Sequence, residues 1–233
     1  MKTRNLISVL AIIIGLNANA FAQNSVSSDI HIPKDKKVSR EVSTVSGDIY
    51  IGNGARVNAN VSAVSGDIEI GTKATTKNVN VVSGDIDVGK GAKTGSLETV
   101  SGDVHLYEKS EAQGFIETVS GDVNFDSGVE SHEYIKTVSG DIELDDSRLR
   151  GDIKTVSGDI SLFNGSMVDG DIIINRKPGA VIKIPQKQKV IIDMNSVVRG
   201  SILVKEPNTN VIVYLVNGGK VKGEIVNAEV RKQ

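Results

Sequence analysis

Seven aspartates recur along the chain at a spacing of roughly 18–19 residues, which indicates a short repeat, each within the phrase Val-Ser-Gly-Asp-Ile or Val-Ser-Gly-Asp-Val. Carboxylates repeated at this interval offer two kinds of chemistry. They can bind cations such as Ca²⁺ between successive copies, or accept backbone N–H hydrogen bonds at a corner of the chain. Known Ca²⁺-binding β-roll repeats have a period only about half as long, so the structural role is favoured and no cofactor is expected. The candidate residues are Asp48, Asp67, Asp85, Asp103, Asp122, Asp141 and Asp159.

The constant spacing predicts how these carboxylates are positioned. A short, regular period is typical of a solenoid, in which each turn of chain stacks on the previous one. The repeat is rich in β-branched residues, contains a glycine in every copy and has no 3.6-residue apolar stripe, which excludes helix. We predict an all-β, single-domain parallel β-solenoid of about ten turns of 18–19 residues, with turns about 4.8 Å apart and irregular C-terminal turns.

Within the repeat, the valine before serine, the glycine, the following Ile or Val and a last apolar residue fall at alternate positions. Alternate positions share one face of a strand, so all four columns are predicted to point inward. The glycine column then has two explanations. Either a Cβ would meet the opposite wall of a thin core, or the corner needs a positive φ. The valine column is Val45, Val64, Val82, Val100, Val119, Val138 and Val156.

Other chemistry is poorly supported. A threonine precedes the valine in five copies and resembles the arrays of ice-binding proteins, although threonine also suits any strand. The chain has three dispersed histidines and no cysteine, so it lacks the side chains that a nucleophilic triad or a zinc site needs. No enzyme and no metal site is therefore expected. An acidic repeat region with few aromatic residues excludes a nucleic-acid partner. The threonine column is Thr44, Thr99, Thr118, Thr137 and Thr155.

The chain divides into four segments. Residues 1–22 have a basic start, a short apolar run and small residues before a cleavage point after Ala22, as in a secretory signal peptide. Residues 23–37 are predicted to be a flexible lead-in, residues 38–175 the regular turns, and residues 176–233 irregular final turns and a cap. No transmembrane span is expected in the mature chain, which we place in the periplasm or outside the cell.

Charge is uneven along the mature chain. Residues 23–175 contain 25 acidic and 14 basic residues, whereas residues 176–233 contain 4 acidic and 11 basic residues. Solvated surface explains both segments. The alternative is that the basic end contacts an anionic partner or the acidic body of another copy.

The phrase Thr-Val-Ser-Gly-Asp-Ile, repeated after a signal peptide, resembles a bacterial family of unknown function that is labelled as adhesins. The resemblance covers about residues 38–230 and is strongest over 44–162. It implies a single-domain β-solenoid of the envelope and carries over no catalytic or binding residue. We therefore expect an exported, non-enzymatic, adhesin-like binding or scaffold module, with an envelope protein or glycan as its partner. The alternative is a polymer-forming solenoid, resembling bactofilins, that self-associates through its terminal turns. Ca²⁺ binding and ice binding are minor alternatives.

Overall fold

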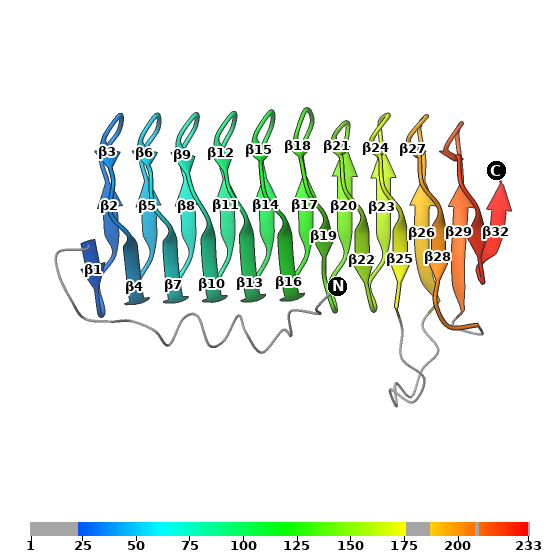
Figure 1. Ribbon diagram of the computed structural model, residues 1–233, viewed down its shortest axis with the longest axis horizontal. Helices are drawn as coiled ribbons and strands as arrows, with labels where there is room; N and C mark the ends of the chain where they lie inside the picture. The colour runs from blue at the N-terminus through cyan, green and yellow to red at the C-terminus, as the bar shows by residue number, and fades with distance from the viewer. Residues whose placement is uncertain (1–22, 176–186, 208–209, 233) are drawn as a thin grey trace.

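The chain folds as one row of stacked turns built from three parallel β-sheets, as the computed structural model shows (Figure 1). The structure describes residues 23–175, 187–207 and 210–232. Each turn contributes one strand to each sheet, except that the last described turn has none in the third sheet, and no helix occurs in these ranges. The predicted parallel β-solenoid is therefore confirmed. The signal peptide predicted for residues 1–22 lies outside the described residues, as do residues 176–186 of the predicted final segment.

Sheet A begins each turn and has eleven strands. Its neighbours are one repeat apart, so that Val79 pairs with Leu97 and Ser83 with Ser101. In spatial order, its strands are β1 (Gln23–Ser25), β4 (Val42–Ser46), β7 (Val61–Ser65), β10 (Val79–Ser83), β13 (Leu97–Ser101), β16 (Ile116–Ser120), β19 (Ile135–Lys136), β22 (Ile153–Thr155), β25 (Ile172–Ile174), β28 (Ile202–Val204) and β31 (Ile225–Val226).

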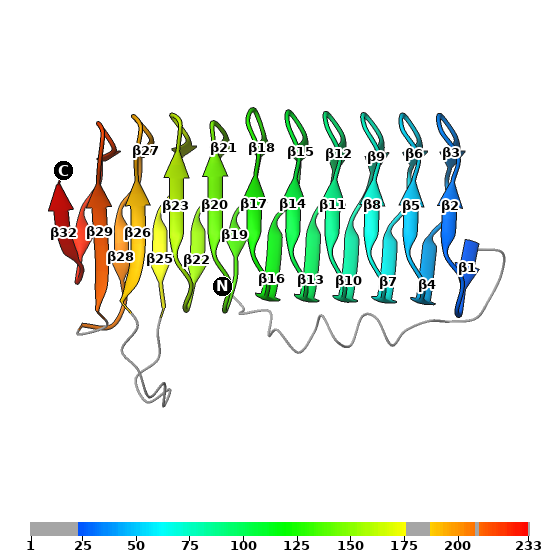
Figure 2. The same ribbon diagram turned by 180° about the vertical axis from the view of Figure 1, so that it is seen from behind.

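Sheet B follows the Ser-Gly-Asp corner and also has eleven strands, which lie side by side when seen from behind (Figure 2). They are β2 (Ile30–Ile32), β5 (Ile49–Ile51), β8 (Ile68–Ile70), β11 (Ile86–Val88), β14 (Val104–Leu106), β17 (Val123–Phe125), β20 (Ile142–Asp145), β23 (Ile160–Phe163), β26 (Gln188–Ile192), β29 (Val211–Leu215) and β32 (Glu229–Lys232).

Sheet C closes each turn with ten two-residue strands. They are β3 (Lys37–Val38), β6 (Arg56–Val57), β9 (Thr75–Thr76), β12 (Lys93–Thr94), β15 (Glu111–Ala112), β18 (Glu130–Ser131), β21 (Arg148–Leu149), β24 (Met167–Val168), β27 (Val197–Val198) and β30 (Lys220–Val221).

The first turn begins earlier than predicted. Residues 23–37, expected to form a flexible lead-in, contain β1, β2 and the start of β3, which pair with β4, β5 and β6. The sequence carries a signal for this turn, because residues 26–30 read Val-Ser-Ser-Asp-Ile and Ser27 precedes Ser46 by one full repeat. Serine replaces the glycine of the phrase at Ser28, which hides this eighth copy from a search for the exact motif.

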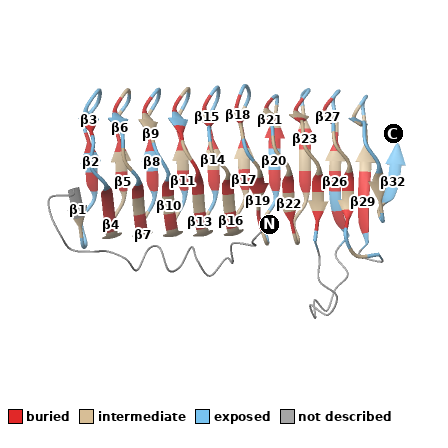
Figure 3. Ribbon diagram, in the orientation of Figure 1, coloured by how far each residue is buried: buried red, intermediate tan, exposed pale blue. Residues whose placement is uncertain are grey.

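The core is a stack of inward columns, one set per turn (Figure 3). Every sheet B strand from β2 to β29 buries its first and third residues, as Ile86 and Val88 do in β11. In the five-residue strands of sheet A the first and third residues are buried, as in Val79 and Val81 of β10. Phe125 is the largest fully buried side chain.

The valine column does not point inward, contrary to the prediction. Val82 and its equivalents are only partly buried, whereas the preceding column, which carries the threonines, is buried. The reason is the corner: the inward residues Val81 and Ile86 are five positions apart, so strict alternation does not continue through Ser-Gly-Asp. The alternation holds within each strand and restarts after the corner.

The glycine column is required by the neighbouring turn. Its φ angles are positive, for example +134° at Gly66 and +109° at Gly158. A Cβ built on Gly121 lies 1.9 Å from the carbonyl oxygen of Gly102, one turn earlier. The positive-φ explanation is thus correct, and the predicted clash exists, but with the adjacent turn instead of the opposite wall.

We predict that Gly121→Ala destabilises the protein by more than Gly165→Ala. Gly165 also has a positive φ, of +84°, but a Cβ there has nothing within 4 Å. Gly165→Ala should therefore cost only the backbone term, about 1–2 kcal/mol, while Gly121→Ala adds a clash with backbone that cannot rotate away. Urea denaturation of both variants measures this. Equal losses of stability would show that the contact between turns is unimportant.

Candidate functional site

The seven predicted aspartates form a hydrogen-bonded ladder at the Ser-Gly-Asp corner. The Oδ1 atom of each accepts a hydrogen bond from the backbone N–H of the aspartate one turn later, at 2.7–2.9 Å between successive members from Asp48 to Asp159. Asp29, which the sequence analysis missed, adds an eighth member before Asp48 at 3.0 Å. The ladder ends where Asp159 Oδ1 accepts the N–H of Lys189 at 2.7 Å.

These bonds explain how like charges are tolerated in a row. Two carboxylates about 5 Å apart repel by roughly 0.8 kcal/mol in water. A hydrogen bond to a charged acceptor contributes about 1.5–3 kcal/mol, which is enough to offset that repulsion. The surrounding backbone is also paired between turns, because Gly84 N–H donates to Ser101 O and Ile86 N–H donates to Asp103 O. Each ladder aspartate therefore has a structural role, and cation binding by the ladder remains a prediction.

A second, shorter ladder lies at the entry to sheet A. Asp152 Oδ1 accepts the N–H of Asp171 at 3.0 Å, Asp171 Oδ1 accepts that of Ser201 at 2.7 Å, and Ser201 Oγ accepts that of Glu224 at 3.1 Å. Burial alone would raise the pKa of Asp152, but the Asp171 N–H and the Lys154 ammonium, 3.0 Å from Oδ2, outweigh it and lower this pKa. The Gly-Asp-Ile sequences in this part of the chain thus form the same kind of hydrogen-bonded ladder at a different corner of the turn.

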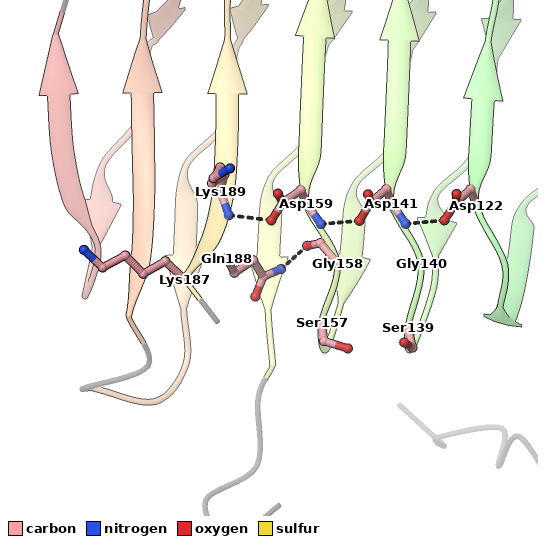
Figure 4. A pocket seen from close by; sticks show the side chains of 10 residues that line it. All are labelled: Asp122, Ser139, Gly140, Asp141, Ser157, Gly158, Asp159, Lys187, Gln188 and Lys189. Carbon is pink, nitrogen blue, oxygen red and sulfur yellow. Dashed lines mark hydrogen bonds between the residues drawn. The ribbon is translucent and has the colours of Figure 1, made fainter. Parts of the chain in front are cut away.

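A groove of about 750 Å³ lies where the long ladder ends (Figure 4). Its volume is within the usual range for ligand sites. Gln188 Nε2 donates a hydrogen bond to Gly158 O at 2.5 Å beside the ladder bond between Lys189 and Asp159. The lining residues are Asp122, Ser139, Gly140, Asp141, Ser157, Gly158, Asp159, Lys187, Gln188 and Lys189.

The comparisons with known proteins agree with this architecture. The family model described as Toastrack DUF4097 matches residues 6–127 and 77–211. The chain belongs to the Toastrack DUF4097 family. The two matches overlap, as expected when one model is placed on an array of similar units. No curated protein and no solved structure matches the chain significantly.

The threonine column of this Toastrack chain lies inside the solenoid. Thr99, Thr118 and Thr137 are at most 3 % exposed, and Thr155 Oγ1 donates to Ser157 O at 2.8 Å. The predicted likeness to an ice-binding array required these hydroxyls on an outer face. Their burial contradicts that interpretation, and the error follows from the assignment of the valine column to the core.

Sheet B of the Toastrack fold brings together one acid–base pair that the sequence analysis missed. His105 Nε2 lies 3.0 Å from Asp126 Oδ1, and the rings of His105 and Tyr107 stack with centroids 4.0 Å apart. Burial raises the pKa of the nearby Asp87, although its hydrogen bond with Tyr107 acts in the opposite direction. These side chains come from different columns of successive turns, so only the stacking of the turns shows that they meet.

The described part of the Toastrack chain offers neither a metal cluster nor a membrane helix. Within those ranges, no group of three or more His, Cys, Asp or Glu side chains has an arrangement that suits a metal ion. The same ranges contain no helix of the length and hydropathy needed to cross a bilayer.

We predict that Asp103→Ala costs roughly 1 kcal/mol of stability, because the N–H of Asp122 loses its acceptor. Asp103→Asn should cost less, since its side-chain oxygen can still accept that bond. Glu69→Ala, at an exposed position of sheet B, is the control. Thermal denaturation of the three variants measures the effect. If the Ala and Asn variants lose equal stability, the ladder bond is not what Asp103 provides.

The pKa of Asp152 predicts a pH dependence. Because the folded state lowers this pKa, its stabilising contribution is present above the ordinary pKa of about 3.9 and is lost as pH falls through the folded value. The stability advantage of the native chain over Asp152→Asn should therefore shrink below about pH 4. Urea midpoints at several pH values test this, with Glu69→Gln as the control. An advantage that is constant with pH, or equally pH-dependent in the control, would contradict it.

Proposed function

We propose that this Toastrack protein is an exported, non-enzymatic β-solenoid that serves as an adhesin-like binding or scaffold module of the cell envelope. The observation that carries the proposal is the in-register stacking of three long sheets. It turns every outward position of the repeat into a row of side chains along the axis. Such an extended, rigid surface suits recognition of a partner more than catalysis, which needs convergent groups in a closed site.

The outward rows support a binding role because they are polar and cross-linked between turns. On sheet C, Arg148 and Arg199 both pair with Asp169, at 2.7 and 2.9 Å. Lys93 pairs with Glu111 at 2.5 Å in the same sheet. Ion pairs between turns hold long side chains in fixed positions, so the surface is preorganised. An envelope protein or glycan is the partner that this surface and the predicted signal peptide favour together.

The acid–base pair of sheet B does not alter this preference. His105, Tyr107 and Asp126 are each about one-third exposed and lie on an open face. General acid–base catalysis needs a substrate held in fixed geometry beside such a pair. The groove lies at the Ser-Gly-Asp corner and does not include these residues.

Self-assembly is the second candidate function. The sheets have β1, β2 and β3 at one edge and β31, β32 and β30 at the other. The residues of β32 are exposed, and Val230 is 41 % exposed. Terminal strand edges of this kind are templates for another chain. Sedimentation of the mature chain over a range of concentrations separates this candidate from a monomeric binding module, because a concentration-independent monomer contradicts assembly.

We predict that the mature chain, beginning after Ala22, captures a discrete envelope component. The experiment is a pull-down from a solubilised envelope fraction, with cell fractionation of the full-length chain in parallel. The full-length chain should be found in the envelope or the medium, and a chain lacking residues 1–22 should remain in the cytoplasm. Gly121→Val, which disrupts the stacking of turns, is the control for folding-dependent capture. A full-length chain found only in the cytoplasm would overturn the proposal.

A further inference from the structure

The groove marks the point where the Ser-Gly-Asp phrase is replaced. Ile160 of β23 pairs with Val190 of β26, so the turn between them is longer than the regular repeat. In that register Lys187 stands where Ser157 stands, Gln188 where Gly158 stands, and Lys189 where Asp159 stands. From one turn to the next, the corner thus changes from Ser-Gly-Asp to Lys-Gln-Lys. The acidic ladder on one side and the two lysines on the other form the groove.

Gln188 is the unusual residue of this corner. It is 5 % exposed, and its Nε2 is satisfied by Gly158 O. Its Oε1 is buried and has no hydrogen-bond partner among the described residues. Figure 4 shows the Gln188 amide beside Gly158, where the long ladder ends. A buried acceptor without a donor costs about 1–3 kcal/mol. Gln188 Oε1 is one of ten such buried side-chain atoms among the described residues, and it is the one that belongs to a residue lining the groove. A ligand that donates a hydrogen bond here would remove that cost.

The rest of the lining also favours a ligand rich in hydrogen-bond donors. The ladder uses Oδ1 of Asp141 and Asp159, which leaves the Oδ2 oxygens as further acceptors. These carboxylates repeat once per turn, at the strand spacing of about 4.8 Å. This distance is close to the length of one sugar unit in a β-linked chain. Lys187 and Lys189 add donors that suit the hydroxyl and ring oxygens of a sugar.

We propose that this groove binds a glycan chain containing amino sugars. Its ammonium and hydroxyl groups would donate to Asp141, Asp159 and Gln188 Oε1, in step with the turns, while the lysines contact sugar oxygens. Ammonium groups are favoured because three carboxylates line the groove and the side chain of Lys187, one of its two lysines, extends away from them (Figure 4). This inference rests on the proposed binding function and names its ligand class.

The test is isothermal titration of the mature chain with the β-1,4-linked glucosamine tetramer, and with its fully N-acetylated form for comparison. The glucosamine tetramer should bind more tightly. Asp159→Asn and Asp141→Asn should each weaken binding about tenfold, the effect of losing one charge-assisted hydrogen bond. Asp67→Asn is the matched control. Asp67 has the equivalent position in an earlier turn of the same ladder but lies outside the groove, so this substitution should leave binding unchanged.

Gln188 gives a second pair of variants. Gln188→Met and Gln188→Glu both lose the hydrogen bond that Nε2 donates to Gly158 O. Only Gln188→Glu keeps an acceptor at this position, so it should bind the tetramer more tightly than Gln188→Met does. Melting temperatures establish that each variant is folded. If either Gln188 variant is unfolded, the two aspartate variants still decide the matter.

Several outcomes overturn the inference. The first is an absence of binding by the tetramer, and the second is an equal loss of binding in Asp67→Asn. The third is spermine binding as tightly as the tetramer with the same response to the variants, which would indicate a general polycation site. If the native chain and Asp159→Asn capture an envelope partner equally well, the glycan site in the groove is contradicted and the proposed envelope function stands. If the chain is found only in the cytoplasm but binds the tetramer through the groove, the envelope function is contradicted and the glycan site stands.

Discussion

The close approach of successive backbones at the Ser-Gly-Asp corner is the constraint on which the rest of the structure depends. A glycine carbonyl lies so near the glycine of the next turn that no Cβ fits, as at Gly102 and Gly121. The same corner supplies three hydrogen bonds between turns, from the glycine N–H, the aspartate N–H and the following apolar residue. These contacts set the register at every turn that carries the phrase, and the strands on both sides follow it.

The small variation in the length of the regular turns is absorbed away from this corner. Val57 of β6 pairs with Thr76 of β9, and Val61 of β7 pairs with Val79 of β10. The connection from Thr76 to Val79 is therefore shorter by a single residue than the connection from Val57 to Val61, and both lead from sheet C to sheet A. Connections of this kind run over the surface and tolerate a change in length, whereas a corner with backbone contacts on both sides does not.

Much of this architecture can be predicted from the sequence because a stacked repeat shows each structural position several times. The strands, the corners and the aspartate row follow directly from the columns. The outward direction of Val82 does not follow from the columns. The prediction assumed that inward and outward positions alternate through the Ser-Gly-Asp corner, and the backbone of that corner interrupts the alternation. The turn at residues 23–37 was missed because Ser28 replaces glycine. At the end of the stack the Cβ of residue 28 meets no preceding described turn, so the constraint on glycine is relaxed there.

The groove is harder to predict because its residues lie on opposite sides of an interruption. Thr155 pairs with Ile174 at the regular interval, whereas Ile160 pairs with Val190 at a much longer one. The added residues therefore fall between the sheet A strand and the three corner positions, which Lys187, Gln188 and Lys189 occupy without a further interruption. Nothing in the sequence alone aligns Gln188 with Gly158. In a repeat fold, a local departure from the consensus costs stacking contacts and persists where another requirement acts. Here Gln188 and Lys189 keep two hydrogen bonds to the preceding turn, so the stacking continues through the departure. The departure also places two cations and a buried amide oxygen beside an acidic row. The proposed glycan site is argued from that second effect, because the stacking alone does not require it.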